Sequence, residues 1–192
     1  MGSWGINAFQ SDIGLDAIGD IRNNLLTNGE LKLGDAIALL QQDEWYAPSS
    51  KDGRSHTGME ALAELIVKFI NHDLNDIDLT EDSQKFSELS SFIAEKNDIK
   101  ELRDYLADTL HSAVETEKEN SENGDPNFDA IFGGWYDQED WIEWQDHMSK
   151  LIQHLDTLLS YEGNDVLNLA TLDLPKPSDN QENEQTDVPL IL

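Results

Sequence analysis

The chain contains no cysteine, which excludes disulfides and thiolate chemistry and fits a reducing compartment. It is also poor in positive charge: 12 lysine and arginine residues face 40 aspartate and glutamate residues, for a formal net charge of −28. A field of this sign repels the phosphates of nucleic acids and anionic lipids, and it attracts basic proteins. We therefore expect no direct contact with nucleic acid or a membrane. The excess of acid favours either solubility or the capture of a basic partner.

Long apolar runs are missing as well. No run approaches the ~18 residues that a membrane-spanning helix requires. The first residues have neither the basic segment nor the apolar segment of a secretory signal, so the sequence predicts a cytoplasmic protein. A length of 192 residues suffices for one domain, and a hydrophobic content of 38% predicts a modest core.

Known catalytic motifs are absent too. The sequence contains no HExxH, P-loop, GxGxxG or GxSxG pattern. The acidic stretch 72–83 fails as an EF-hand, because counting from Asp73 puts Ile77 at the fifth position and Gln84 at the twelfth. The sequence accordingly predicts a protein that is not an enzyme and that has no catalytic residue, no cofactor and no metal.

What the sequence does contain is helical periodicity. Apolar residues recur every three or four positions in stretches that begin near Asp12, Leu33, Thr57, Phe86, Asp98 and Trp141. The predicted fold is all-α: a single compact bundle of five or six amphipathic helices over residues 1–171, followed by a disordered acidic tail over 172–192. No stretch favours a strand over a helix, and a small hairpin within 127–136 is left as an alternative.

Local signals refine two of these helices. Ser11 stands just before the first apolar run and is a predicted N-cap. Thr57 and Glu60 have the spacing of a capping box, which predicts a helix start at Thr57. Gly14 and Gly19 lower the helix propensity of the first helix, and we interpret them as positions where the preceding segment packs closely.

The first twelve residues are unusually apolar for the start of a chain. Trp4 and Phe9 are large anchors, Gly5 permits a tight bend beside the tryptophan, and Asp12 begins the first helix. We predict an N-terminal arm that is fixed to the bundle by Trp4, Gly5, Phe9 and Asp12. A direct functional surface is the alternative interpretation of this arm.

The opening Met1-Gly2-x-Trp4-Gly5, followed by Phe9, Asp12 and Asp16, is similar to the start of a family of small acidic bacterial proteins known only as a domain of unknown function. The resemblance is specific over residues 1–16 and looser over the rest of the globular part. The family has no established activity, so the resemblance implies no catalytic residues. Some relatives look like immunity proteins that neutralise a toxin, and this implies a protein partner here as well.

Aromatic and acidic residues alternate over positions 135–144. Aromatic anchors surrounded by acids suit a basic protein partner, such as a toxin or an enzyme that acts on nucleic acid. The predicted partner-binding residues are Trp135, Tyr136, Asp137, Glu139, Asp140 and Glu143. The alternative is that these aromatic residues only fill the core. A homo-oligomer whose contact is made by Trp135 and residues 188–192 is a further hypothesis.

A row of polar residues flanks the apolar stripe of the last predicted helix: Asp140, Glu143, His147, Lys150 and His154. Glu143 and His147 are four residues apart and could hold a divalent ion on one face of a helix. A metal-binding protein or metal-dependent hydrolase that uses Glu143, His147 and His154 is therefore the alternative function. Lys150 opposes a cation in this row, and a solvated helix flank explains all five residues equally well.

The arm gives a first testable prediction. If Trp4 is a core anchor, Trp4→Ala should lower the free energy of unfolding in urea by about 3–5 kcal/mol, as deletion of a buried aromatic side chain does. A variant that melts like the wild type but loses a partner would show instead that Trp4 belongs to a binding surface.

Overall fold

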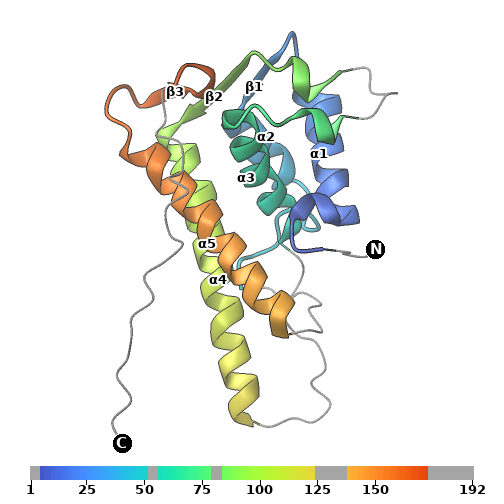
Figure 1. Cartoon of the computed structure of the whole chain (residues 1–192), viewed down its shortest axis with the longest axis vertical. Helices are drawn as coiled ribbons and strands as arrows, with labels where there is room; N and C mark the ends of the chain where they lie inside the picture. The colour runs from blue at the N-terminus through green and yellow to red at the C-terminus, as the bar shows by residue number, and fades with distance from the viewer. Residues whose placement is uncertain (1–4, 52–55, 79–83, 124–137, 173–192) are drawn as a thin grey trace, which may run out of the picture.

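The structure is a computed structural model that describes residues 5–51, 56–78, 84–123 and 138–172. Within these ranges the chain is mostly helical, with a small sheet at one end of the helices (Figure 1). The α-helices are α1 (Asp12–Leu25), α2 (Leu33–Leu40), α3 (Thr57–Ile70), α4 (Lys96–Asn123) and α5 (Gln138–Ser160). The strands are β1 (Glu30–Lys32), β2 (Ser91–Glu95) and β3 (Val166–Asn168).

Helix α1 begins as the sequence predicts. The side chain of Ser11 accepts a hydrogen bond from the backbone N–H of Gly14 at 3.0 Å, which confirms Ser11 as the N-cap. Not every apolar residue of α1 is buried, since Leu15 is 43% exposed, whereas Arg22 on the same helix is buried. After the helix the chain reverses at Asn28 and Gly29, which both have positive φ and lead into β1.

Helix α3 is the centre of the bundle. Nine consecutive residues, 58–66, are buried, because α1, α2, α4 and α5 all pack against this helix. The predicted helix start at Thr57 is confirmed, but the capping box is wrong. The N-cap is His56, which makes no side-chain cap bond, and the Glu60 side chain is directed into the protein toward α5.

The predicted all-α class is corrected by the three-stranded mixed sheet. Strand β1 pairs with β2 in parallel, with Leu31 opposite Phe92, and β2 pairs with β3 antiparallel, with Ala94 opposite Leu167. These four side chains are buried in the core. The short helix predicted from Phe86 is wrong, because residues Phe86–Glu88 form one 3-10 turn and the chain then extends into β2.

Helices α4 and α5 form a long antiparallel pair beside α3 (Figure 1). Both were expected from their periodicity, and α4 extends to Asn123. The buried stripe of α5 is Trp144, Met148, Leu151, Leu155 and Leu158. Neither of these helices, nor any other in the part of the chain that the structure describes, is long and apolar enough to cross a membrane.

The N-terminal arm packs as a single 3-10 turn, η1 (Ala8–Gln10), against α1 and α3. Ala8 is fully buried, and the half-buried ring of Phe9 lies 5.7 Å from the ammonium group of Lys68. Trp4 lies outside the described residues. Leu172, the first residue of the predicted tail over 172–192, is half-buried against the core. The rest of that tail and the alternative hairpin within 127–136 lie outside the described ranges.

The arm and α1 meet at one of the two predicted close-packing glycines. A Cβ atom on Gly14 would lie 2.0 Å from the carbonyl oxygen of Ala8, whereas a Cβ on Gly19 would meet nothing within 4 Å. Gly14→Ala should therefore lower the free energy of unfolding by about 1–3 kcal/mol, because arm and helix must separate.

Gly19→Ala is the matched control, since it makes the same chemical change on the same helix. It should raise the free energy of unfolding by about 0.5–1 kcal/mol through helix propensity alone. Urea denaturation of the two variants measures both effects. Equal behaviour of the two alanines would show that the arm does not pack on α1 as described.

Candidate functional site

Two glutamate side chains of the central helix α3 are buried. Glu60 and Glu64 are one turn apart on α3, within its fully buried stretch, and their side chains are only 5% and 7% exposed. Carboxylates are almost never buried to this extent without partners, because burial removes their hydration. The surrounding elements must therefore supply hydrogen bonds or charge.

Glu64 is well supplied with partners. Its Oε1 accepts a hydrogen bond from the backbone N–H of Ala8 at 2.7 Å, and it lies 2.7 Å from Nε2 of His147. Ala8 belongs to the arm and His147 to α5, so one carboxylate connects three segments that are far apart in the sequence. Two short polar contacts therefore meet at a single oxygen of Glu64.

The carboxyl group of Glu60 has fewer and longer hydrogen-bonding contacts. Its Oε2 accepts a long hydrogen bond of 3.4 Å from the indole N–H of Trp144. Its Oε1 is buried without a hydrogen-bond partner and lies 3.5 Å from Nε2 of His147. Burial, and next the negative charge of Glu64, raise the pKa of Glu60 well above its ordinary value, while the Trp144 bond acts in the opposite direction.

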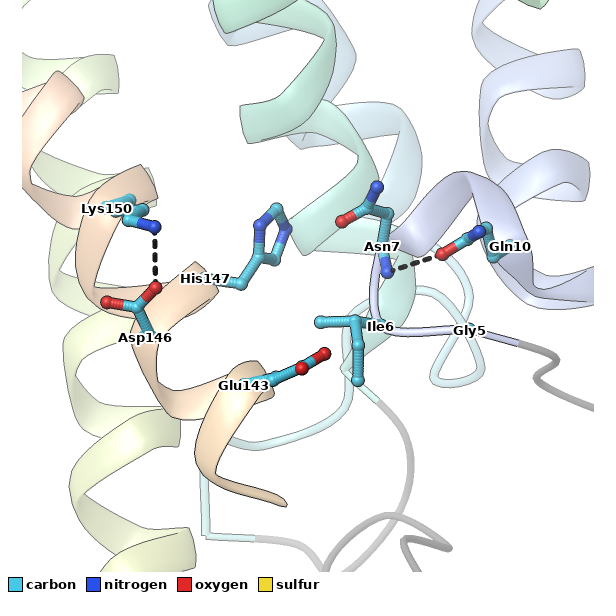
Figure 2. A pocket seen from close by; sticks show the side chains of 8 residues that line it. All are labelled: Gly5, Ile6, Asn7, Gln10, Glu143, Asp146, His147 and Lys150. Atoms are coloured by element: carbon cyan, nitrogen blue, oxygen red, sulfur yellow. Dashed lines mark hydrogen bonds and ion pairs between the residues drawn. The ribbon is translucent and has the colours of Figure 1, made fainter. Parts of the chain in front are cut away.

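An open pocket lies between the arm and α5, and His147 is the member of the cluster that lines it (Figure 2). The residues that line it are Gly5, Ile6, Asn7 and Gln10 from the arm and Glu143, Asp146, His147 and Lys150 from α5. His147 is 21% exposed and belongs both to the pocket and to the buried cluster. Lys150 is paired with Asp146 at 2.6 Å, so its charge is already compensated.

The predicted partner-binding residues divide into two groups. Glu139, Asp140 and Glu143 are exposed on the first turns of α5. Trp135, Tyr136 and Asp137 lie outside the described residues. Trp141 is half-buried and stacks on Trp144 with ring centroids 5.2 Å apart, so these two tryptophans belong to the packed side of the helix.

Three of the four predicted anchor residues lie within the described part of the chain. Gly5 lines the pocket, Phe9 lies in η1 against the core, and Asp12 is the first residue of α1. Phe9 is thus partly buried against the core. The buried contact nearest to the site is nevertheless made by the backbone of Ala8, which the sequence did not single out.

The alternative metal residues are not brought together as a set. Among the described residues, the ligand atoms that lie within 4.8 Å of one another belong to Glu60, Glu64 and His147, and the group does not include Glu143 or His154. Burial lowers the pKa of His154.

Sequence reasoning missed Glu60 and Glu64 as site residues, although a signal was present: they are the two charged residues in the otherwise apolar stretch 58–67.

No protein-family model, no curated protein and no solved structure matches this chain. The similarity of residues 1–16 to a family of acidic bacterial proteins therefore stays a prediction. What the site can do has to be inferred from its own geometry.

The raised pKa of Glu60 predicts a pH dependence of stability. The folded chain holds the Glu60 proton more tightly than the unfolded chain, so this contribution is complete below the ordinary glutamate pKa and is lost as the pH rises through the folded value. Glu60→Gln should therefore raise the free energy of unfolding at pH 8 by about 1–3 kcal/mol, because glutamine is neutral in both states and removes the cost of keeping this carboxyl group buried at a pH where the unfolded chain ionises it. It should also flatten the fall in stability between pH 5 and pH 8.

Urea denaturation in the presence of a chelator measures both effects. Glu64→Gln is the control, because it weakens two short hydrogen bonds and should destabilise the protein. Other groups also change the stability with pH: the remaining acids repel one another, and Asp78, whose pKa is lowered, contributes in the opposite direction. These contributions are common to the wild type and the variants, so they do not affect the comparison. Parallel pH profiles for wild type and Glu60→Gln would refute the prediction.

Proposed function

We propose that the protein is a non-enzymatic interaction protein that binds a basic protein partner through the first turns of α5. The proposal depends on Ile142, whose side chain is 57% exposed. Acidic side chains surround it, with Glu139 one turn before, Glu143 adjacent and Asp146 one turn after. We call Glu139, Asp140, Ile142, Glu143 and Asp146 the acidic face of α5.

Helix stability alone explains only part of this face. Glu139 and Asp140 lie in the first turn, where negative charge favours the positive end of the helix dipole. That effect fades within one turn, and Asp146 is explained by its ion pair with Lys150, so it is Glu143 that helix stability leaves unexplained. Helix stability also gives no reason for an isoleucine in water, which a basic partner with an apolar patch would cover.

The charge of the whole chain supports the same partner. A net charge of −28 speeds the approach of a basic protein, and residues 138–146 carry four acids and no lysine or arginine. An exposed apolar side chain inside such a patch adds affinity after the encounter. Together with the resemblance over residues 1–16, these features favour an immunity- or antitoxin-like role against a basic toxin or an enzyme that acts on nucleic acid.

A photo-crosslinking residue at position 142 in cells of the native host tests the proposal. We expect a crosslink to one basic protein from this position and none from position 15, where Leu15 is comparably exposed on α1. Crosslinks between copies of the chain would support the homo-oligomer instead. Equal crosslinking from both positions would count against a specific face.

The purified pair then allows a charge test. Reversing two acids one turn apart with Glu139→Lys and Glu143→Lys should slow association at least about tenfold at low salt and reduce its salt dependence. The matched control is Glu115→Lys with Glu119→Lys on α4, which has the same spacing and the same change in net charge. If both pairs slow association equally, net charge acts without the acidic face of α5.

A further inference from the structure

The charges of the buried cluster do not balance when both of its carboxyl groups are ionised. Glu60 and Glu64 bring two carboxylates, and among the described residues His147 is the one basic side chain within 4.0 Å of either. A protonated imidazole compensates one negative charge, and Glu60 Oε1 is still buried without a hydrogen bond. A divalent cation held by two carboxylates and a neutral imidazole would leave no net charge.

The three side chains also have the spacing of a ligand set. Nε2 of His147 lies 3.5 Å from Oε1 of Glu60 and 2.7 Å from Oε1 of Glu64. Bonds of 2.0–2.2 Å to a tetrahedral ion place ligand atoms roughly 3.3 Å apart. The observed distances bracket this value, so the contact between His147 and Glu64 must open by about 0.6 Å when an ion binds between them.

Hydrogen bonds from outside hold the carboxylates in place. The backbone N–H of Ala8 donates to Glu64, and the indole N–H of Trp144 donates to Glu60. Ligands of protein-bound metals are commonly oriented by such bonds. His147 lines the open pocket between the arm and α5, so the cluster borders a solvent-accessible space on that side (Figure 2). A catalytic-type or exchangeable metal site keeps a position of this kind for water.

We propose that Glu60, Glu64 and His147 bind one divalent transition-metal ion of the Zn²⁺ type, which links α3, α5 and the arm. An imidazole nitrogen favours transition metals, whereas Mg²⁺ and Ca²⁺ prefer six or more oxygen ligands. This site uses different residues from the acidic face of α5, and it does not depend on the proposed protein partner.

Calorimetric titration of the metal-free full chain with Zn²⁺ tests the proposal. We expect one tight site per chain, and Glu60→Gln and His147→Gln should each weaken it at least about 100-fold, because loss of a supporting bond alone costs 10- to 100-fold. Glu143→Gln is the matched control, since it removes a carboxylate from the same pocket but not from the cluster. It should bind Zn²⁺ like the wild type.

Two measurements on the wild type do not depend on any variant. Zn²⁺ should shift the ring-nitrogen resonance of His147, and it should slow hydrogen exchange of the Ala8 amide, which donates to Glu64. Urea denaturation in chelator checks that Glu60→Gln is folded, as expected because glutamine keeps an acceptor for Trp144.

Several outcomes would overturn the proposal. Equal Zn²⁺ affinity in wild type and Glu60→Gln would do so, as would several equivalent weak sites, which would indicate surface carboxylates only. Unchanged His147 and Ala8 signals at saturating Zn²⁺ would exclude this location. Equal affinity for Mg²⁺ or Ca²⁺ would reject the transition-metal assignment.

Discussion

The burial of two carboxylates in helix α3 constrains most of the surrounding structure. Glu64 requires donors, and these come from the backbone of Ala8 and from His147. The arm must therefore approach α3 closely, which is sterically possible because Gly14 has no side chain next to Ala8. Helix α5 must present Trp144 and His147, three residues apart, to Glu60 and Glu64, and this requirement fixes its rotation about its own axis.

Stability does not explain why the glutamates are there. Replacing buried charges by apolar residues of similar volume is often neutral or stabilising, and every neighbour in 58–66 is already apolar or small. Glu60 in particular keeps one buried oxygen without a hydrogen bond. In natural proteins, buried charges and unpaired buried polar atoms that weaken the fold occur mainly at functional sites. This favours a role for the cluster beyond packing.

The sequence predicts those elements whose signal is local. Helix α5 has one polar side and one apolar stripe, and Ser11 caps α1 with its own side chain, so both could be recognised without the fold. The strands could not, since β1 and β3 have three residues each and acquire their pairing from distant segments. Phe92 was assigned to a helix because one buried phenylalanine fits either period.

The cluster was missed for a related physical reason. Glu60 three residues after Thr57 fits a solvent-exposed capping box, and only the packing of α5 against α3 shows that this face is buried. Helix α3 is apolar on almost every side, so its periodicity does not distinguish an inner from an outer face. His147 was recognised as a potential ligand, but its partners come from a helix about 85 residues earlier, which spacing within one helix cannot reveal.

Helix α5 contributes to both proposed sites, and the two sites differ in how strongly salt screens their electrostatic interactions. The acidic face of α5 is exposed, so its attraction for a basic partner falls as the Debye length shortens to about 10 Å at 0.1 M salt. Glu60 and Glu64 are shielded from mobile ions by burial, and their interaction with a bound cation is screened much less. Glu143 contributes to the acidic face and to the pocket but not to the buried cluster. Its charge therefore distinguishes steering of a partner from chemistry at His147.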